Sequence, residues 1–342
     1  MRIAPQGHPA ARRVRTAVLA ALTAAVTALP LAAAAPAPAH AAAAPPAAAA
    51  AHPGGARTDE ARLNGHWAPF GRCPVDDPAM LAADGEETVA SCVSSVSAGG
   101  SITLGRTTAR TGANNLQFGV VYHTTSQTFT VVPPPAGSIV GAPTEIPGGL
   151  LGLMCPGNLP VVTEICRLLT DNSLNRVTAT VESVGAPTGF SLTAGLSAGE
   201  PIVTLPVRIR LRNPFLGSQC FIGSAADPIV LRPRNAVAPA FGVELFRGDG
   251  TPDEEGEMVR FALTGTAQED RTFAVPRARG CGALGLLSGA LDLKTGLPSP
   301  AGRNSLVLDA AVTHNGALNA PGLYFPDAGR QLARFRHSAV LP

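Results

Sequence analysis

Short apolar runs bounded by turn residues recur along most of the chain. In residues 204–212, apolar and polar side chains alternate with the period of a strand that has one buried face. The 37 glycines and 32 prolines suit many turns. The pattern predicts an all-β, mainly antiparallel fold, as one large sandwich or two packed β lobes. The predicted strands begin near Ser101, Asn115, Thr128, Val177, Thr204, Pro228, Val243, Met258 and Ser305.

Two segments instead show the period of a short helix. Residues 160–172 begin with a proline, which suits a first helical position, and their apolar residues fall on one face. Residues 283–293 are shorter and interrupted by glycine. The strand period is lost near residues 190–201, which is therefore a possible boundary between two lobes.

The amino terminus has the composition of an export signal. A basic, acid-free stretch precedes an alanine-rich apolar run, and Ala39-His40-Ala41 fits the small-x-small cleavage rule. We interpret residues 1–41 as a signal peptide, residues 42–62 as a flexible Ala/Pro-rich spacer and residues 63–342 as a secreted β-rich domain. The Arg12-Arg13 pair leaves the export route open, because it is not followed by the apolar pair of a twin-arginine signal.

Removal of this signal changes the charge balance. The formal net charge of +2 includes four arginines of the signal, so 22 basic residues remain against 24 acidic ones. An acidic mature protein gives no support for nucleic-acid binding. No second long apolar run exists, so we expect no transmembrane anchor in the mature chain.

The cysteine count predicts disulfides. Six cysteines fall in the mature region, an even number in an exported chain. Their spacing, without CxxC pairs or nearby histidines, disfavours a metal site. Nearest-neighbour pairing is one of the possible connectivities and would join the cysteines in chain order. The cysteines are Cys73, Cys92, Cys155, Cys166, Cys220 and Cys281.

Residues 195–199, GLSAG, match the nucleophile-elbow pattern of serine hydrolases. An elbow requires a strand before the serine and a helix after it, whereas Ser197 is followed by Ala-Gly-Glu-Pro and then a strand-like run. Asp309 and His314 come later in the order that a triad would need, but a strand and its turn explain both. We interpret the stretch as a turn.

The acidic stretch at residues 248–257 resembles part of a calcium loop. It lacks the glycine at the sixth position and the glutamate at the twelfth, so we interpret it as a solvated loop between two strands and expect no metal or other cofactor.

Alternation in residues 207–212 places three arginines on one face of a predicted strand. A guanidinium fork matches phosphate well, so this face is the best candidate for binding an anionic wall polymer. Two more arginines could join it if the two strands pair. A plain solvated face that discourages edge pairing is the simpler explanation of the pattern. The candidate binding residues are Arg208, Arg210, Arg212, Arg232 and Arg234.

Three segments resemble uncharacterised exported proteins of actinobacteria, for which no activity is assigned. They are HWAPFGRCPVDDPAM from His66, LPVRIRLRNPFLGSQCFIGS from Leu205 and GLPSPAGRNSLVLDAAV from Gly296. The resemblance implies export and a compact domain, and it transfers no functional residue.

The sequence therefore predicts a non-catalytic, secreted or envelope-associated protein on a disulfide-braced scaffold. Its expected partner is an anionic wall polymer or another envelope component. The alternative is a secreted esterase-like hydrolase that uses Ser197.

Overall fold

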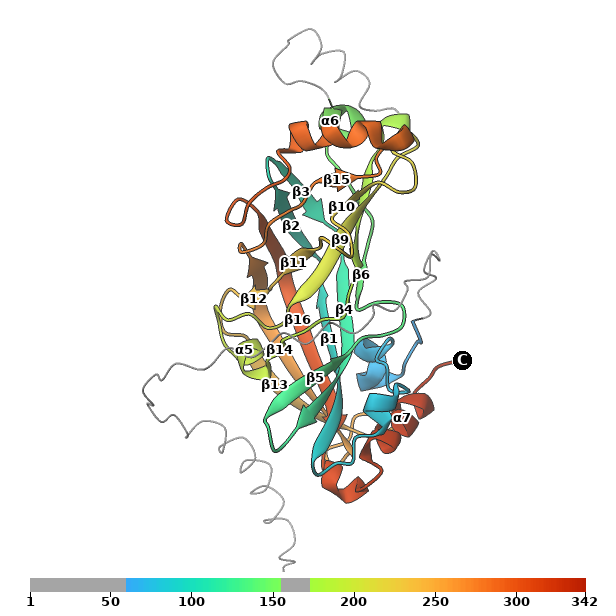
Figure 1. Cartoon of the computed structure of the whole chain (residues 1–342). Helices are drawn as coiled ribbons and strands as arrows, with labels where there is room; N and C mark the ends of the chain where they lie inside the picture. Colours follow the sequence, from blue (N-terminus) through green and yellow to red (C-terminus); the bar gives the residue numbers. More distant parts are fainter. Residues whose placement is uncertain (1–59, 155–172) are drawn as a thin grey trace, which may run out of the picture. The chain divides into compact units, whose positions relative to one another are not determined.

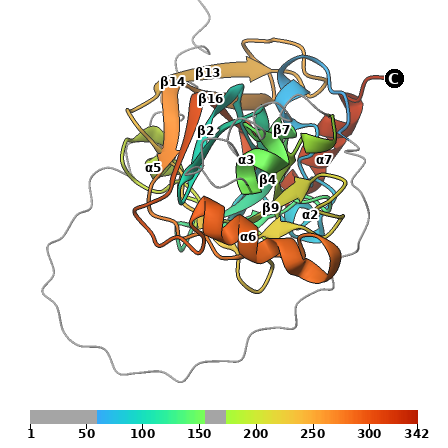
Figure 2. The ribbon, with the colours of Figure 1, turned by 90° about the horizontal axis from the view of Figure 1, so that it is seen from above.

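A computed structural model describes residues 60–154 and 173–342, which belong to one compact unit. This unit is built mainly from antiparallel strands, which confirms the predicted fold class (Figure 1). The strands curve around an interior when they are viewed from above (Figure 2). No helix within the described ranges is long and apolar enough to cross a bilayer.

A long hairpin forms the centre of the sheet. Ser97 faces Asn114 and Gly100 faces Thr111, so the register continues across the break in each arm. The turn is made at Gly105, whose φ of 59° suits glycine. The first arm is β1 (Thr88–Ser97) and β2 (Gly99–Leu104), and the second is β3 (Thr107–Thr111) and β4 (Asn114–His123).

Two further long strands extend the sheet beside the hairpin. Strand β16 (Ser305–Leu318) pairs with both β1 and β2, and β14 (Met258–Asp270) pairs with β16. On the outer side of β14 lie β12 (Arg234–Asn235) and β13 (Ala240–Phe246).

The sheet continues on the other side of the hairpin through shorter strands. Beyond β4, its order is β6, β8, β9, β10 and β15, with β5, β7 and β11 paired to β4, β8 and β9. The short segment from β11 to β12 links the two sides of the sheet, because β11 pairs with β9 and β12 pairs with β14. The bounds are β5 (Thr128–Val132), β6 (Ile139–Gly141), β7 (Thr144–Glu145), β8 (Thr178–Ser183), β9 (Leu205–Arg212), β10 (Phe221–Ile222), β11 (Ile229–Leu231) and β15 (Ala278–Arg279).

Short helices lie against the two ends of this sheet. Helix α6 (Leu286–Thr295) lies at one end (Figure 1) and stops at Gly296, which adopts the left-handed conformation common after helices. Helix α7 (Ala328–Ser338) packs near α2 and β1 at the other end. The remaining helical segments are η1 (Gly65–Phe70), α2 (Pro78–Leu81), α3 (Gly149–Met154), η2 (Ser173–Asn175), α5 (Leu192–Leu196), η3 (Ala283–Gly285) and η4 (Pro321–Tyr324).

Helix α6 confirms the helix predicted in residues 283–293. The helix predicted in residues 160–172 lies outside the described residues. Helix α7 was not predicted from the sequence. It buries Leu332 and Ala333. Because arginines make up much of its sequence, this narrow apolar stripe gives only a weak helical period.

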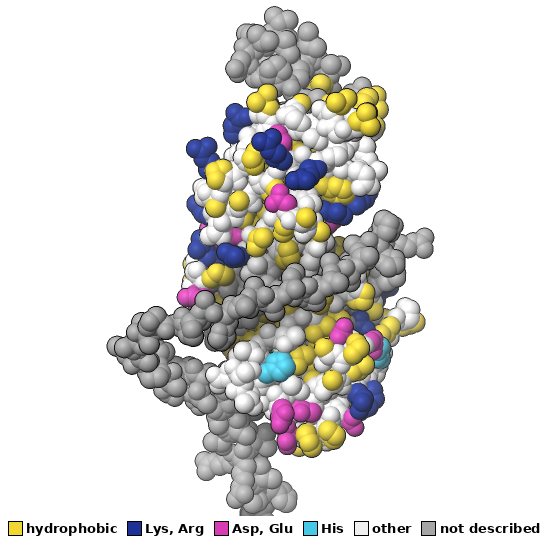
Figure 3. Space-filling model, viewed as in Figure 1, with side chains coloured by type: hydrophobic (Ala, Val, Ile, Leu, Met, Phe, Trp, Pro, Cys, Tyr) yellow, Lys and Arg dark blue, Asp and Glu magenta, His cyan; other side chains and the backbone are white. Residues whose placement is uncertain are grey.

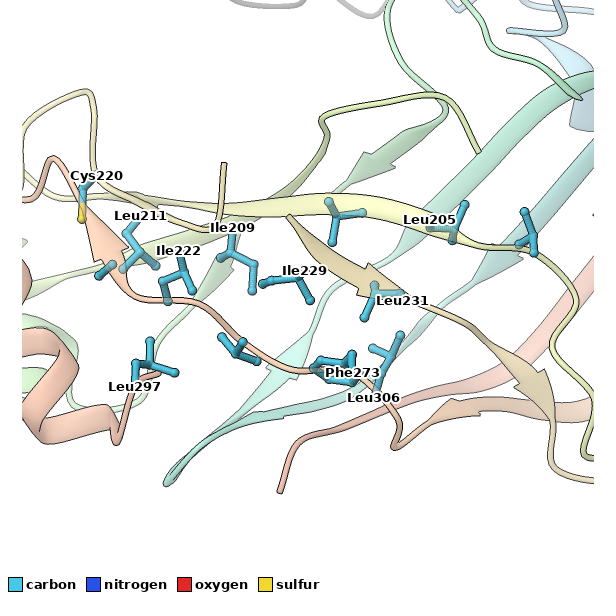
Figure 4. Packing of buried hydrophobic residues seen from close by; sticks show 14 of the residues in the cluster. Leu205, Ile209, Leu211, Cys220, Ile222, Ile229, Leu231, Phe273, Leu297 and Leu306 are labelled. Carbon is cyan, nitrogen blue, oxygen red and sulfur yellow. The ribbon is translucent and has the colours of Figure 1, made fainter. Parts of the chain in front are cut away.

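Two apolar clusters stabilise the unit. One lies in the interior of the curved sheet, and it includes Ile209 and Leu211 of β9 as well as Leu297 and Leu306 on the opposite side (Figure 4). The other joins η1 and α7 to the sheet, and it contains Trp67, whose indole nitrogen donates to the Gly248 carbonyl at 2.8 Å.

Two of the predicted disulfides are present. Cys73 joins Cys92, and Cys220 joins Cys281, as nearest-neighbour pairing would give. The second closes a loop with a sequence separation of 61, which removes about 4 kcal/mol of unfolded-state entropy on the loop model. Cys155 and Cys166 lie outside the described residues.

Candidate functional site

The interior of the curved sheet contains two adjoining compartments, each with a cavity volume of about 70 Å³. The same side chains border both of them, so the two compartments adjoin one another at these residues. These shared residues are Ile102, Thr111, Asn114, Val181 and Ile209. A smaller cavity of about 20 Å³ adjoins the second compartment at Leu116 and Pro233. The cavities therefore form a series within the sheet.

The first compartment lies at the α6 end. Alternation in β9 turns Ile209 and Leu211 inward, and β8 contributes Ala179 and Val181 from the neighbouring strand. Leu291 of α6 completes the lining from that end. Apolar carbon makes up almost the whole wall.

The second compartment lies nearer the middle of the sheet. It is lined by Leu205 and Val207 of β9, Leu231 of β11, and Leu306 and Leu308 of β16. The two sides of the sheet thus contribute opposite walls of one apolar space.

Two hydroxyl groups face this interior without a hydrogen-bond partner among the described residues. They belong to Ser97, which is 3% exposed, and Thr111, and both residues border the second compartment. An unsatisfied buried hydroxyl costs about 1–3 kcal/mol, so a bound water or a polar atom of a ligand would stabilise this part of the wall.

The first compartment has a polar rim along the edge strand β3. Arg110 and Ala142 are exposed and border the cavity, and Thr107 lies beside them. No ion pair to Arg110 occurs within the described part of the chain. Thr107, Ala109 and Thr111 alternate with Arg110 along β3, so the rim offers hydroxyl groups next to an apolar interior and a cation on the outer face of the same edge strand.

No protein-family model matches this chain, and neither curated proteins nor solved structures provide a match. The site geometry therefore carries the functional argument.

Strand β9 carries its arginines on one face, as predicted. Its apolar residues are buried, and they alternate with the half-buried Arg208 and Arg210 and the exposed Arg212. Glu182 of β8 occupies two of its arginines: its carboxylate lies 2.8 Å from Arg208 and 2.9 Å from Arg210. Both guanidinium groups also lie over the ring of Phe221, at 4.1 and 5.0 Å from its centre. Much of the predicted charge is thus neutralised within the sheet.

Arg210 and Arg212 still border a broad groove on this outer face. Its volume is about 600 Å³, and Arg176 and Asn213 also contribute to its wall. Arg176 is paired with Glu145 at 3.1 Å. Arg212 has no ion pair within the ranges that the structure describes.

Arg232 and Arg234 do not join the arginine face. Strands β9 and β11 pair, as the hypothesis required, but they run antiparallel, so the chain after Leu231 moves away from Arg212 and toward β14. Arg234 lies 3.8 Å from Glu269 of β14. The predicted group of five arginines is therefore divided between two places.

The elements around Ser197 are reversed relative to a nucleophile elbow. Helix α5 precedes Ser197, and the serine hydroxyl donates to the Ala194 carbonyl at 3.4 Å. Asp309 is exposed on β16, while His314 lies edge-on to Phe70 with ring centres 6.4 Å apart. Within the described ranges, no hydrogen bond or ion pair joins the serine, the aspartate and the histidine.

His314 instead belongs to a charged group that the sequence did not indicate. Burial, assisted by the positive charge of Arg260, lowers the pKa of His314 from 6.5 to about 4. Burial also lowers the pKa of His66, which lies 3.6 Å from Glu244. Arg260 binds the same glutamate at 2.5 Å. These residues come from segments far apart in the sequence, so no local motif could have identified them.

The acidic stretch is the loop between β13 and β14, as expected. Asp249 accepts hydrogen bonds from the backbone and hydroxyl of Thr251, and Asp253 pairs with Arg247 at 2.6 Å. Both aspartates thus have partners within the loop, and no metal-binding cluster occurs in the described parts of the chain.

Proposed function

We propose that this protein is a non-catalytic, exported binding protein that holds the apolar chain of a lipid inside its curved sheet. The observation that carries the proposal is the apolar lining of the two adjoining compartments. A space lined by carbon is poorly hydrated and accepts an apolar guest without loss of hydrogen bonds.

The size of the interior supports a chain and not a bulky ligand. The two volumes together accommodate roughly ten water-sized spheres, or on the order of 300 Å³ of liquid, which is the lower end for small-molecule sites. The compartments adjoin one another along the strands of the interior. A flexible chain fits such a narrow space.

The rim suggests which end of the ligand faces water. Arg110 lies on the outer face of the edge strand that borders the apolar cavity, and a carboxylate or phosphate head group held outside this edge would gain a charge-assisted hydrogen bond from it. The proposed ligand class is therefore an amphiphile with an acyl chain and an anionic head. The signal-like amino terminus and the two disulfides support export.

The test measures the binding of a fatty acid of about ten carbons by titration calorimetry, with two variants of one strand. Val181→Phe adds an aromatic ring to the wall shared by both compartments. Thr180→Phe adds the same ring at the neighbouring position, whose side chain points to the opposite face of β8. We expect Val181→Phe to weaken binding at least about tenfold, or about 1.4 kcal/mol, and Thr180→Phe to bind like the wild type.

Thermal unfolding of both variants shows whether each remains folded. Absence of binding by the wild-type protein would overturn the proposal. So would equal binding by the wild type and a folded Val181→Phe variant, because the fatty acid would then occupy another place.

The outer groove supports a second candidate, the anionic wall polymer proposed from the sequence. Arg212 is exposed there beside Arg210, and both border the groove of about 600 Å³. The pairing of Arg208 and Arg210 with Glu182 weakens this candidate relative to the interior cavity.

A further inference from the structure

Helix α6 has an unusual distribution of side chains. Its solvent side consists of Leu286, Gly289, Ala290 and Leu293, all without a polar group. Leu286 is 76% exposed and Leu293 is 78% exposed. A helix on a protein surface normally turns its polar residues to water. This side is therefore suited to an apolar environment and not to bulk solvent.

Two polar side chains of α6 are turned toward the protein instead. Asp292 is buried and accepts a hydrogen bond from the Ala278 backbone at 2.8 Å, while the Thr295 hydroxyl donates to the Leu291 carbonyl at 2.7 Å. Leu291 and Thr295 also line the first compartment. One helix thus separates the proposed ligand site from the exposed leucines.

Further apolar side chains are exposed at the same end. Leu284 of η3 is completely exposed, and Phe215 is 56% exposed. The loop that carries Phe215 is held to the start of η3, because the Gly282 backbone donates to the Leu216 carbonyl at 2.8 Å. The apolar surface therefore extends from α6 onto the neighbouring loop, and we call these four side chains, Leu284, Leu286, Leu293 and Phe215, the α6 patch.

Charge is divided between the two ends of the unit. Residues 99–111, 139–154, 173–183, 205–235 and 268–309 build the α6 end, and they contain thirteen arginines and lysines against seven acidic residues. The rest of the described chain has seven basic and fourteen acidic residues. Most of the basic side chains lie in the upper half of Figure 3, near α6, and acidic ones gather toward the opposite end.

We propose that the α6 patch docks on the surface of an anionic lipid membrane, from which the acyl chain enters the cavity. This inference rests on the proposed function and names the source of its ligand. Leucines and a phenylalanine enter the interfacial layer of a bilayer, and nearby arginines bind anionic head groups. The acidic opposite end is repelled by the same surface, which orients α6 toward the membrane.

The experiment measures co-sedimentation of the full mature protein with vesicles of phosphatidylglycerol and phosphatidylcholine. The patch variant is Leu286→Ser with Leu293→Ser. Its matched control, Leu323→Ser with Val340→Ser, removes two exposed apolar side chains, 82% and 46% exposed, from outside the α6 patch. We expect the patch variant to bind vesicles at least about tenfold more weakly and the control to bind like the wild type.

A second variant tests the charges. Arg277 and Arg279 are exposed and lie at β15, which packs under α6. Changing both to glutamine should weaken binding to the anionic vesicles about tenfold, and binding should fall with added salt. Vesicles of phosphatidylcholine alone should bind wild type and this variant equally weakly.

Fatty-acid binding in the absence of vesicles separates this inference from the proposed function. Loss of vesicle binding with intact fatty-acid binding in the patch variant supports docking. Failure of the wild type to bind anionic vesicles overturns docking, even if fatty-acid binding persists. Two other results overturn docking, because the α6 patch would then be covered by this chain. The first is vesicle binding that appears only after deletion of residues 155–172. The second is a wild-type dimer that the patch substitutions dissociate.

Discussion

Asp270 offers a sharp test of how the two sides of the sheet are held together. It is completely buried at the end of β14. One carboxylate oxygen accepts from the Arg232 backbone at 2.6 Å, and the other accepts from the backbone and hydroxyl of Thr272, both at 2.7 Å. Arg232 lies in the segment that links β11 to β12. The aspartate therefore fixes that segment to β14.

The cost of removing this carboxylate follows from the groups it leaves behind. Asp270→Ala deprives two backbone N–H groups of their acceptor, at about 1–3 kcal/mol each, and also removes the hydroxyl bond. We expect the free energy of unfolding to fall by about 3–5 kcal/mol. Asp270→Asn retains one acceptor oxygen and should cost about half as much. Thr272→Val removes only the hydroxyl bond and should cost about 1 kcal/mol.

Urea unfolding followed by fluorescence of Trp67 measures these differences. The order of destabilisation should be Asp270→Ala, then Asp270→Asn, then Thr272→Val. Pro233 and Leu231, which line the second compartment, lie in the linked segment, so Asp270→Ala should also weaken fatty-acid binding. A loss below about 1 kcal/mol for Asp270→Ala would refute the reasoning, since the linking segment would then be held by other contacts.

Two other residues give independent predictions. Folding lowers the pKa of His314 from 6.5 to about 4, so the unfolded chain binds the proton more tightly than the folded protein. The contribution of His314 to the free energy of unfolding is therefore complete above pH 6.5. It falls by at most about 3 kcal/mol as the pH drops to 4. His314→Gln should reduce this slope in acid unfolding, and an unchanged slope would contradict it. Arg212→Ser should lower sedimentation with purified cell walls at low salt about fivefold, whereas Arg303→Ser, an exposed control, should not. Equal sedimentation of the Arg212→Ser and Arg303→Ser variants with cell walls would contradict the wall-polymer candidate.

The local strand pattern predicted much of the sheet. The runs at residues 204–212 and 305–313 became β9 and β16. Strand β9 alternates strictly between an apolar interior and the outer face, whereas β16 does so only near its start, where Leu306 is buried. The run beginning at Ser101 was predicted as one strand, and this was wrong: Gly105 makes a turn within it, so the run contributes to both β2 and β3. In each case, side chains that are near in sequence decide the structure.

Strand β1 was missed for a physical reason. Its sequence, TVASCVSSVS, places serines where a core strand normally has large apolar residues, yet Ser91 and Ser94 are buried. This strand lies in the middle of the sheet and is covered by η1 and α7 on the face away from the interior. Small polar residues allow that close packing, and burial on both faces removes the alternation that marks a strand.

The interior cavity was beyond the sequence because it depends on how distant strands curve. Ile102, Val181 and Ile209 are ordinary core residues in any local window. Only the assembled sheet shows that they face one space that their side chains leave unfilled. The charged group around His314 was missed for the same reason, since Glu244, Arg260 and His66 meet it from three other segments.

Strand β9 joins the two candidate functions. Its inward residues, such as Ile209, line the cavity, and its outward residues, such as Arg210, border the outer groove. The period of two keeps these surfaces on opposite faces of one strand, so a substitution on one face leaves the chemistry of the other in place.

Contact between the surfaces is possible only where the strand ends, at Arg212, close to the loop that carries Phe215. A head group bound in the groove would therefore lie beside the α6 patch, while its chain would have to pass around that loop to reach the cavity. Entry over the rim at Arg110 avoids this obstacle, because Arg110 borders the first compartment directly.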